Sequence, residues 1–271
     1  MQRARRYSII QKNVRKRFFS LLFMEISQYY QTGRYVNRNI NESEIIYRMK
    51  YLIKALKGYR FKTVLDAACG DGGLGKLIKE KWGVKVYGAD ISRKGVRLAR
   101  KFGVEAKVCD LSEKIPFKDK SFDMVFSSES IEHFVNPDKF LREVNRVLKP
   151  KGIIVITSPN LSSWLNRILF LFGIYPIALE ASTEKLVGLG ILSKFANGDQ
   201  VVGHIHLFNY RALRDILLYH GYAIKKVVGM PMDYESPRSR LLTKMYRIVD
   251  SFFSAFIPLS SNYVVVARKI K

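Results

Sequence analysis

The sequence predicts an α/β fold in which helices cover both faces of a mostly parallel sheet. From residue 62 onward, short apolar segments typical of buried strands alternate with segments of helical periodicity. The first strand segment, residues 63–66, leads into a glycine-rich turn and then into a helix. Such alternation places consecutive strands in one sheet, and right-handed crossovers leave few topologies.

The same rhythm continues through the middle of the chain. We expect strands at 63–66, 84–89, 105–108, 122–127 and 152–157, and helices at 74–81, 93–102 and 137–148. The alternation ends after Pro159, where residues 161–179 are apolar but interrupted by Gly173 and Pro176. This stretch is too short and too broken for a membrane-spanning helix, which needs about 20 apolar residues.

The C-terminal third returns to the α/β pattern. Expected there are a helix at 210–220, with Asn209 as its N-cap, and strands at 222–228 and 262–268.

The whole chain reads most simply as a helical N-terminal cap followed by one domain. The cap, residues 1–60, carries an apolar stripe that ends at Gly58. The domain, residues 61–271, contains insertions at about 160–203 and 231–260.

The composition points to an anionic partner without naming it. With 47 Lys and Arg against 23 Asp and Glu, the formal net charge is +24. Nucleic acid, an anionic membrane surface or a phosphorylated substrate would each suit this charge. A proteome that is rich in Lys and Arg throughout would produce the same number.

Cysteine usage fits a reducing cytoplasm. Cys69 and Cys109 are the only two cysteines, and neither is placed like part of a disulfide scaffold. No histidine stands at metal-ligand spacing from them, so no metal site is expected.

The N-terminus is basic and amphipathic, and it lacks a secretory hydrophobic region. Seven Lys or Arg residues precede the first acid, Glu25, and alternate with apolar residues. Such a segment can lie on an anionic membrane, serve as an organelle transit peptide, or form a solvated helix that caps the domain.

Four features converge at the carboxyl edge of the predicted sheet, where open α/β sheets bind their ligands. They are the loop 69–72, Asp90, Asp110, and the segment 127–129. Glycines let a backbone approach a ligand closely. A carboxylate twenty residues after Gly70 can accept hydrogen bonds from a ribose diol, and Asp110 can accept one from an exocyclic amine.

A dinucleotide site is the first alternative. Residues 70–75 match G-x-G-x-x-G. In that fingerprint the loop faces a pyrophosphate, which the carboxylate of Asp66 at the strand end would oppose. Asp66 instead suits an ammonium group, or it orders the loop.

The chain resembles the class I S-adenosylmethionine-dependent methyltransferases of the small-molecule type, in a pattern close to the quinone-biosynthesis O-methyltransferases. The matching segments are 64–72, 88–92, 110–111, 115–117, 121–125, 129–133 and 141–152. The resemblance is strong from about 62 to 158 and weaker from about 203 to 228. It leaves the first 40 residues and both insertions uncovered.

This resemblance implies a Rossmann-like, doubly wound sheet of seven strands in the order 3-2-1-4-5-7-6, with the last strand antiparallel. It also implies S-adenosylmethionine as cofactor, with the methionine part in the glycine loop, the ribose on Asp90, the adenine on Asp110, and Ser127 and Ser128 near the sulfonium. The positions carried over are Arg48, Asp66, Ala68, Cys69, Gly70, Gly72, Asp90, Ile91, Asp110, Leu111, Ser127 and Ser128. Ala68 departs from the family's usual glycine, which is tolerable if its φ is negative.

A base is needed only where the methyl acceptor must lose a proton, as a hydroxyl does. Candidates are His133, His204 and His206, with Glu129 as runner-up. Each histidine also has an ordinary interpretation as a structural or substrate-positioning residue.

The apolar insertions are the best clue to the acceptor. They form either a lid that shields the reaction from water or a funnel for a lipid-like small molecule at an anionic membrane. Segment 127–130 lacks the Asn/Asp-Pro-Pro-aromatic tetrad of enzymes that methylate nucleobase amines. An RNA methyltransferase that uses the basic surface, and a non-catalytic cofactor-binding protein, remain the alternatives.

Overall fold

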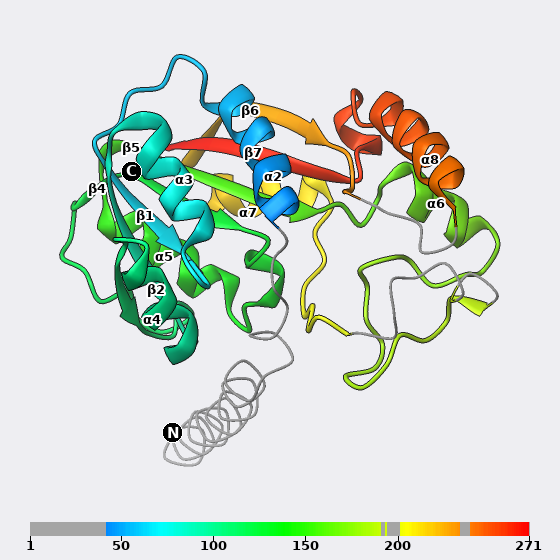
Figure 1. The fold of residues 1–271 in the computed structure, drawn as a ribbon, viewed down its shortest axis with the longest axis horizontal. Helices are drawn as coiled ribbons and strands as arrows, with labels where there is room; N and C mark the ends of the chain where they lie inside the picture. Colours follow the sequence, from blue (N-terminus) through cyan, green and yellow to red (C-terminus); the bar gives the residue numbers. More distant parts are fainter. Residues whose placement is uncertain (1–41, 191–192, 194–200, 234–238, 271) are drawn as a thin grey trace, which may run out of the picture.

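The computed structural model describes residues 42–190, 193, 201–233 and 239–270 (Figure 1). The basic N-terminal stretch, and with it most of the expected helical cap, lies outside the described residues.

A seven-stranded sheet forms the centre of the molecule, in the order β3-β2-β1-β4-β5-β7-β6. The strands are β1 (Thr63–Ala67), β2 (Lys85–Asp90), β3 (Glu105–Val108), β4 (Phe122–Ser128), β5 (Leu148–Pro159), β6 (Tyr222–Met230) and β7 (Asn262–Lys269). The strands β1 to β5 pair in parallel, whereas β7 is antiparallel to both β5 and β6. The order and the antiparallel last strand confirm the expected topology.

Helices follow the strands in the expected alternation. They are α2 (Glu42–Leu56), α3 (Gly73–Trp82), α4 (Arg93–Lys101), α5 (Pro137–Val147), α6 (Trp164–Leu171), α7 (Tyr210–Tyr219) and α8 (Arg240–Phe253). Short 3-10 turns lie at Ile131–His133 and Ile257–Leu259. The expected cap of α7 is confirmed, because the Asn209 side chain accepts the N–H of Ala212 at 2.9 Å.

Two hydrophobic cores flank the sheet, because successive strand residues point to opposite faces. Val64 packs in the core that α2, α3 and α4 cover, and its neighbour Leu65 packs in the core that α5 and α7 cover. Figure 1 shows the resulting three layers. The near-continuous apolar strands of the sequence are explained by this two-sided burial.

The first apolar insertion forms a shorter helix than the expected apolar stretch 161–179. The helix α6 stops at Leu171, and Gly173 turns the chain with φ 66°. The side chain of Asn166 then accepts the N–H of Ile177 at 2.9 Å and donates to its carbonyl at 3.3 Å, which folds the segment back on itself. No helix among the described residues is long and apolar enough to cross a membrane.

The two insertions pack against each other at one end of the sheet (Figure 1). The rings of Trp164 in α6 and Phe253 in α8 are stacked with centroids 5.1 Å apart. The indole Nε1–H of Trp164 donates to Asp250 at 2.7 Å, and this fully buried carboxylate also accepts the N–H of Met232 at 2.7 Å. A buried carboxylate with these donors holds α8 against α6.

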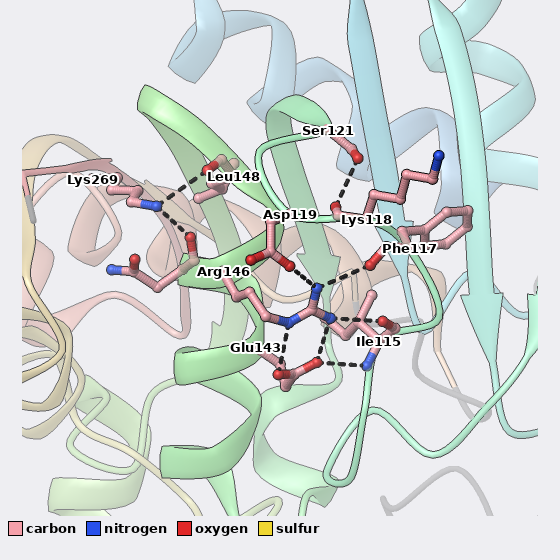
Figure 2. Close-up of polar contacts among 10 residues, drawn as sticks. Ile115, Phe117, Lys118, Asp119, Ser121, Glu143, Arg146, Leu148 and Lys269 are labelled. Carbon is pink, nitrogen blue, oxygen red and sulfur yellow. Dashed lines mark hydrogen bonds and ion pairs between the residues drawn. The ribbon is translucent and has the colours of Figure 1, made fainter.

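The long connection from β3 to β4 is held by one arginine of α5 (Figure 2). The guanidinium of Arg146 donates to both carboxylate oxygens of Glu143, to Asp119, and to the carbonyls of Ile115 and Phe117, at 2.6 to 3.0 Å. The N–H of Ile115 returns a bond to Glu143 at 2.9 Å. The sequence motif around 115–117 therefore has a structural role, since it ties this connection to α5.

Candidate functional site

The glycine loop between β1 and α3 is anchored to β2 and is open at its tip. The N–H groups of Ala68 and Cys69 donate to the carbonyl of Ala89 at 2.8 and 3.2 Å. Gly70 and Gly72 follow with φ of 51° and 81°. A Cβ at Gly70 would meet no heavy atom within 4 Å, so the backbone there borders open space.

Asp90, at the end of β2, supports the loop from below. Its two carboxylate oxygens accept the N–H of Gly70 at 2.8 Å and that of Ser92 at 2.7 Å. Burial raises the pKa of Asp90 above its ordinary value, and these two N–H donors oppose the rise. Gly95 lets α4 approach closely, because a Cβ there would lie 2.7 Å from the carbonyl oxygen of Gly70.

Asp66 lies beneath the loop and not on its open side. A Cβ at Gly75, in the first turn of α3, would lie 3.0 Å from Oδ2 of Asp66. This carboxylate is 3% exposed, and Oδ2 has no hydrogen-bond partner among the described residues. Burial, with the nearby charges of Asp90 and Asp71, raises the pKa of Asp66 to about 7. Oδ2 is available to a proton or to a donor from a ligand, so both expected roles of Asp66 stay predictions.

Ala68 was expected to be tolerated in place of glycine if its φ were negative, and its φ is positive. Its φ is 65°, in the left-handed region that glycine adopts most easily. The strain follows from the loop itself, because Ala68 must turn its N–H toward Ala89 directly after the strand. Both cysteines are free, as expected; burial raises the thiol pKa of Cys69 well above its usual range and that of Cys109 to about 12.

The remaining cofactor candidates follow β3 and β4. Asp110 is half-buried and accepts the N–H of Ser112 at 2.8 Å, whereas the Leu111 side chain belongs to the core beneath α5. Burial raises the pKa of Asp110. Ile91, directly after Asp90, is half-buried.

The two serines that end β4 differ in position. Ser127 is fully buried, and its hydroxyl is hydrogen-bonded to that of Ser130. Ser128 is half-buried, with its hydroxyl 3.0 Å from that of Thr157 in β5. Glu129 then takes a left-handed φ of 46° and donates its N–H to the Thr157 carbonyl at 3.0 Å.

The structure brings two of the three candidate histidines together. The rings of His133 and His204 lie with centroids 4.7 Å apart. Each ring directs its Nδ1 to a main-chain carbonyl, Gly203 at 3.0 Å for His133 and Ala178 at 2.6 Å for His204. His206 lies outside this pair; it is exposed, and its ring is nearest to Phe208.

A buried carboxylate, that of Glu132, completes this group and was not singled out from the sequence. One oxygen of Glu132 and one ring nitrogen of each of His133 and His204 lie within 4.8 Å of one another. The Glu132 side chain is fully buried; Oε2 accepts from the Ser158 hydroxyl at 3.2 Å, and Oε1 has no hydrogen-bond partner in the described part of the chain. The sequence signal was an acidic pair, Glu129 and Glu132, three residues apart after a strand.

Electrostatics single out Glu132 further. Burial, and then the charge of Glu129, raise the pKa of Glu132 well above its ordinary value, while the positive charge of Arg48 lowers it. Arg48 was expected at the cofactor, and the structure places it close enough to influence this carboxylate. An unpaired carboxylate that is removed from water calls for a proton, a cation or a donor from a ligand.

Glu180, in the first insertion, positions the second histidine and was also missed. Its carboxylate accepts the N–H groups of Val202, Gly203 and His204 at 2.7, 2.8 and 3.0 Å. The carbonyl of Glu132 accepts the next two, from Ile205 and His206, at 2.8 and 2.9 Å. The insertion is thereby fastened across the end of β4.

The arrangement has the properties of a site for a nucleoside with a group transferred nearby. The open backbone at Gly70, the buried carboxylate of Asp90 and the half-buried Asp110 line successive strand ends. The group of Glu132, His133 and His204 follows the adjacent strand end. Such an edge, at the carboxyl ends of parallel strands, is where open α/β sheets bind their ligands.

Comparison with known proteins identifies the family of this chain. Residues 65–156 match a protein family described as Methyltransferase domain. The demethylmenaquinone methyltransferase of Chlorobaculum tepidum is 30% identical over 185 residues, which cover 68% of this chain and 74% of that one. The probable tocopherol O-methyltransferase of Oryza sativa subsp. japonica is 35% identical over 114 residues, 39% of this chain and 30% of that one.

A solved structure agrees at the level of the fold. A SAM-dependent methyltransferase of Thermotoga maritima superposes with a TM-score of 0.54 at 19% identity, covering 86% of this chain and 96% of that one.

Proposed function

Because this chain belongs to the class I S-adenosylmethionine-dependent methyltransferases, we propose that it methylates an oxygen atom of an apolar, lipid-like small molecule. The transferase activity and the cofactor follow from membership of the family, which removes the binding-only alternative. The acceptor atom, the lipid-like character of the acceptor and the residue roles below are our proposals.

We infer that the open backbone at Gly70 receives the methionine part of the cofactor. Asp90 accepts hydrogen bonds from two backbone N–H groups and has further lone pairs, which accept hydrogen bonds from the ribose hydroxyls. Asp110 accepts a hydrogen bond from the adenine amine. S-adenosylmethionine supplies a methyl group on a sulfonium, which the acceptor oxygen displaces in line. The residues contribute chiefly by holding the two reactants at near-attack distance.

The group of Glu132, His133 and His204 is the observation that carries the choice of oxygen. A hydroxyl must lose its proton as it becomes a nucleophile, and this group can take it. Because the Nδ1–H of each ring is directed to a carbonyl, Nε2 is the ring atom with a lone pair. The names of the relatives include an N-methyltransferase as well as an O-methyltransferase, so the choice of oxygen rests on this group alone.

An exposed apolar surface supports a lipid-like acceptor. We define the α6/α8 apolar face as Phe170, Leu171, Phe172, Leu241, Met245, Ile248 and Phe252, all exposed. The four α8 residues follow helical spacing on one side of the helix. The basic residues Arg240 and Lys244 are exposed beside them, so the face suits an anionic bilayer.

A chain of contacts connects this face to the acid–base group. Asn166 of α6 binds both main-chain polar groups of Ile177. The next residue, Ala178, accepts from His204, whose ring lies against His133. An acceptor drawn from a bilayer at α6 would therefore meet the insertion that holds the candidate base.

The direct test is methyl transfer from radiolabelled S-adenosylmethionine into separate lipid, RNA and small-molecule fractions of whole cells, with Asp90→Asn as the inactive control. We expect label in the lipid fraction, as a methyl ether by mass spectrometry. Label in RNA alone would establish the RNA alternative, and label on nitrogen or carbon would contradict the choice of oxygen.

The membrane part is tested by flotation with vesicles. The wild type should float with anionic vesicles at low salt, and the double variant Leu171→Glu with Ile248→Glu should not. Leu218→Glu, which alters an exposed leucine of α7, is the matched control. Absence of wild-type binding to anionic vesicles at low salt would refute the proposal.

A further inference from the structure

Three potential ligand atoms of the acid–base group lie close together, although no metal site was expected from the sequence. We propose that Glu132, His133 and His204 bind one divalent first-row transition-metal ion of the Zn²⁺ class, and that this ion holds and activates the acceptor oxygen. The catalytic role of the ion rests on the proposed O-methylation, whereas its binding does not.

The ligand atoms are already close together. One atom from each of the three residues lies within 4.8 Å of the other two. Bonds of about 2.0 to 2.2 Å to zinc place the ligands of one ion within about 4 Å of each other, so side-chain adjustments of roughly 1 Å complete the site. Two imidazoles and one carboxylate form a catalytic donor set that leaves further positions for a substrate.

The two histidines make the kind of hydrogen bond, from the second ring nitrogen, that metal-ligating histidines make in proteins. His133 directs its Nδ1 to the carbonyl of Gly203, and His204 directs its Nδ1 to that of Ala178. Such bonds to main-chain carbonyls fix the tautomer, so that Nε2 carries the lone pair, and they fix the plane of each ring. Glu180 in turn holds the backbone of Gly203 and His204.

The third ligand is a carboxylate of which one oxygen has no hydrogen-bond partner among the described residues. Glu132 is fully buried, and its Oε1 has no hydrogen bond within the described ranges, while Ser158 orients Oε2. Burying such a group without a partner is costly, and a bound cation removes the cost. This unsatisfied oxygen is independent of the histidine geometry, and it points to a ligand in the same place.

The ion supplies a defined chemical step. A hydroxyl bound to it has a lowered pKa, as metal-bound water does. The O–H bond breaks, and the proton passes to solvent water. The electron pair left on oxygen then forms the new O–CH₃ bond as the methyl–sulfur bond breaks, and the sulfur keeps that pair.

Metal binding is measured on the full chain after removal of metal with a chelator, without cofactor or acceptor. Titration with Zn²⁺ and with Co²⁺ should show one equivalent bound, with a Co²⁺ spectrum that lacks a sulfur charge-transfer band. Glu132→Gln and His204→Ala should each weaken binding tenfold or more, by roughly the factor that lost ligand support costs. Mg²⁺, which prefers oxygen ligands, should bind far more weakly.

Matched variants keep the result unambiguous. His206→Ala removes a histidine two positions away from His204 and should leave the stoichiometry and the affinity unchanged. Glu132→Gln should melt at or above the wild-type temperature without metal, because it removes a buried charge, and should lose the rise in melting temperature that Zn²⁺ gives the wild type. The melting temperature without metal reports folding, and its rise on addition of Zn²⁺ reports metal binding, so the two effects are distinguished.

The proposal is overturned if the wild type binds no Zn²⁺ or Co²⁺ stoichiometrically, if both site variants bind as the wild type does, or if Co²⁺ shows thiolate ligation. Those outcomes leave O-methylation by a histidine base intact. Stoichiometric binding with methyl transfer to nitrogen or carbon would refute the O-methylation and retain the metal site.

Discussion

The rings of His133 and His204 lie with their centroids 4.7 Å apart, although one follows β4 and the other ends the first insertion. The contact means that the acid–base group is complete only when the insertion folds back over the strand end. The cofactor loop takes no part in this contact, so the two halves of the site should be separable by mutation.

The substitution Glu180→Ala should impair the acid–base group without affecting the cofactor loop. It removes the carboxylate that accepts the N–H groups of Val202, Gly203 and His204. Displacement of a catalytic group by about 1 Å can cost up to a hundredfold in rate. We expect methyl transfer to fall tenfold or more while S-adenosylmethionine affinity is unchanged. The exposed Glu184 gives the control Glu184→Ala, which should match the wild type in both assays.

The pH dependence of stability should carry the signature of Asp66. Its folded-state pKa of about 7 lies above the ordinary 3.8, so its contribution is full below pH 3.8 and is lost as the pH rises through 7. At about 1.4 kcal/mol per unit, the loss is at most about 4 kcal/mol.

Urea unfolding of the cofactor-free protein from pH 4 to 8 measures this effect. The wild type should lose stability across the range, and Asp66→Asn should show a shallower slope, because its amide stays neutral. Asp123→Asn is the control, since the pKa of Asp123 is lowered to about 2 and its carboxyl does not titrate there. Equal slopes for the wild type and Asp66→Asn would disprove the assignment.

Ala68→Gly should stabilise the protein. A left-handed φ of 65° costs alanine roughly 1 to 2 kcal/mol. Glycine relieves this strain, but its greater flexibility in the unfolded chain offsets about half of the gain in folding free energy. We expect a net gain of about 0.5 to 1 kcal/mol in chemical unfolding. Ala68→Ser keeps a Cβ and should give no gain; a loss of stability on introducing glycine would show that the strain is not there.

Arg146→Lys should cost about 2 kcal/mol, because an ammonium cannot serve Glu143 and two carbonyls together (Figure 2). The carbonyls of Ile115 and Phe117 lose their charged donor. Arg142→Lys, on the exposed side of the same helix, should change stability by less than about 0.5 kcal/mol. Similar values for the two variants would contradict a supporting role for Arg146.

Most of the fold could be predicted from the sequence, because local signals and the final structure agree. The apolar strands are buried on both faces, and the cap at Asn209 is made as expected. The insertions were harder to predict. The break at Gly173 marks the end of α6, but no periodicity encodes the bond from Ile177 to Asn166 that folds the next segment back.

The site was predictable where it is local and not where it depends on contacts between distant segments. Loop 69–72 comes just after β1, and Asp90 is the last residue of β2. Their positions could therefore be predicted from the spacing of the strands in the sequence. Glu132 stands out because it is buried and lies close to His204. His204 follows the first insertion, whose sequence has no periodicity that would predict this contact. The φ of Ala68 is likewise set by its bond to Ala89.

Calorimetry with S-adenosylmethionine tests the placement of the cofactor most directly. We expect micromolar binding by the wild type and a loss of roughly tenfold or more in Asp90→Asn, which keeps the shape but lacks the charge that holds the ribose hydroxyls. Asp71→Asn, in the same loop, can keep its bond to the N–H of Gly73 and should bind like the wild type. Wild-type affinity in Asp90→Asn, or no binding by the wild type, would contradict the site.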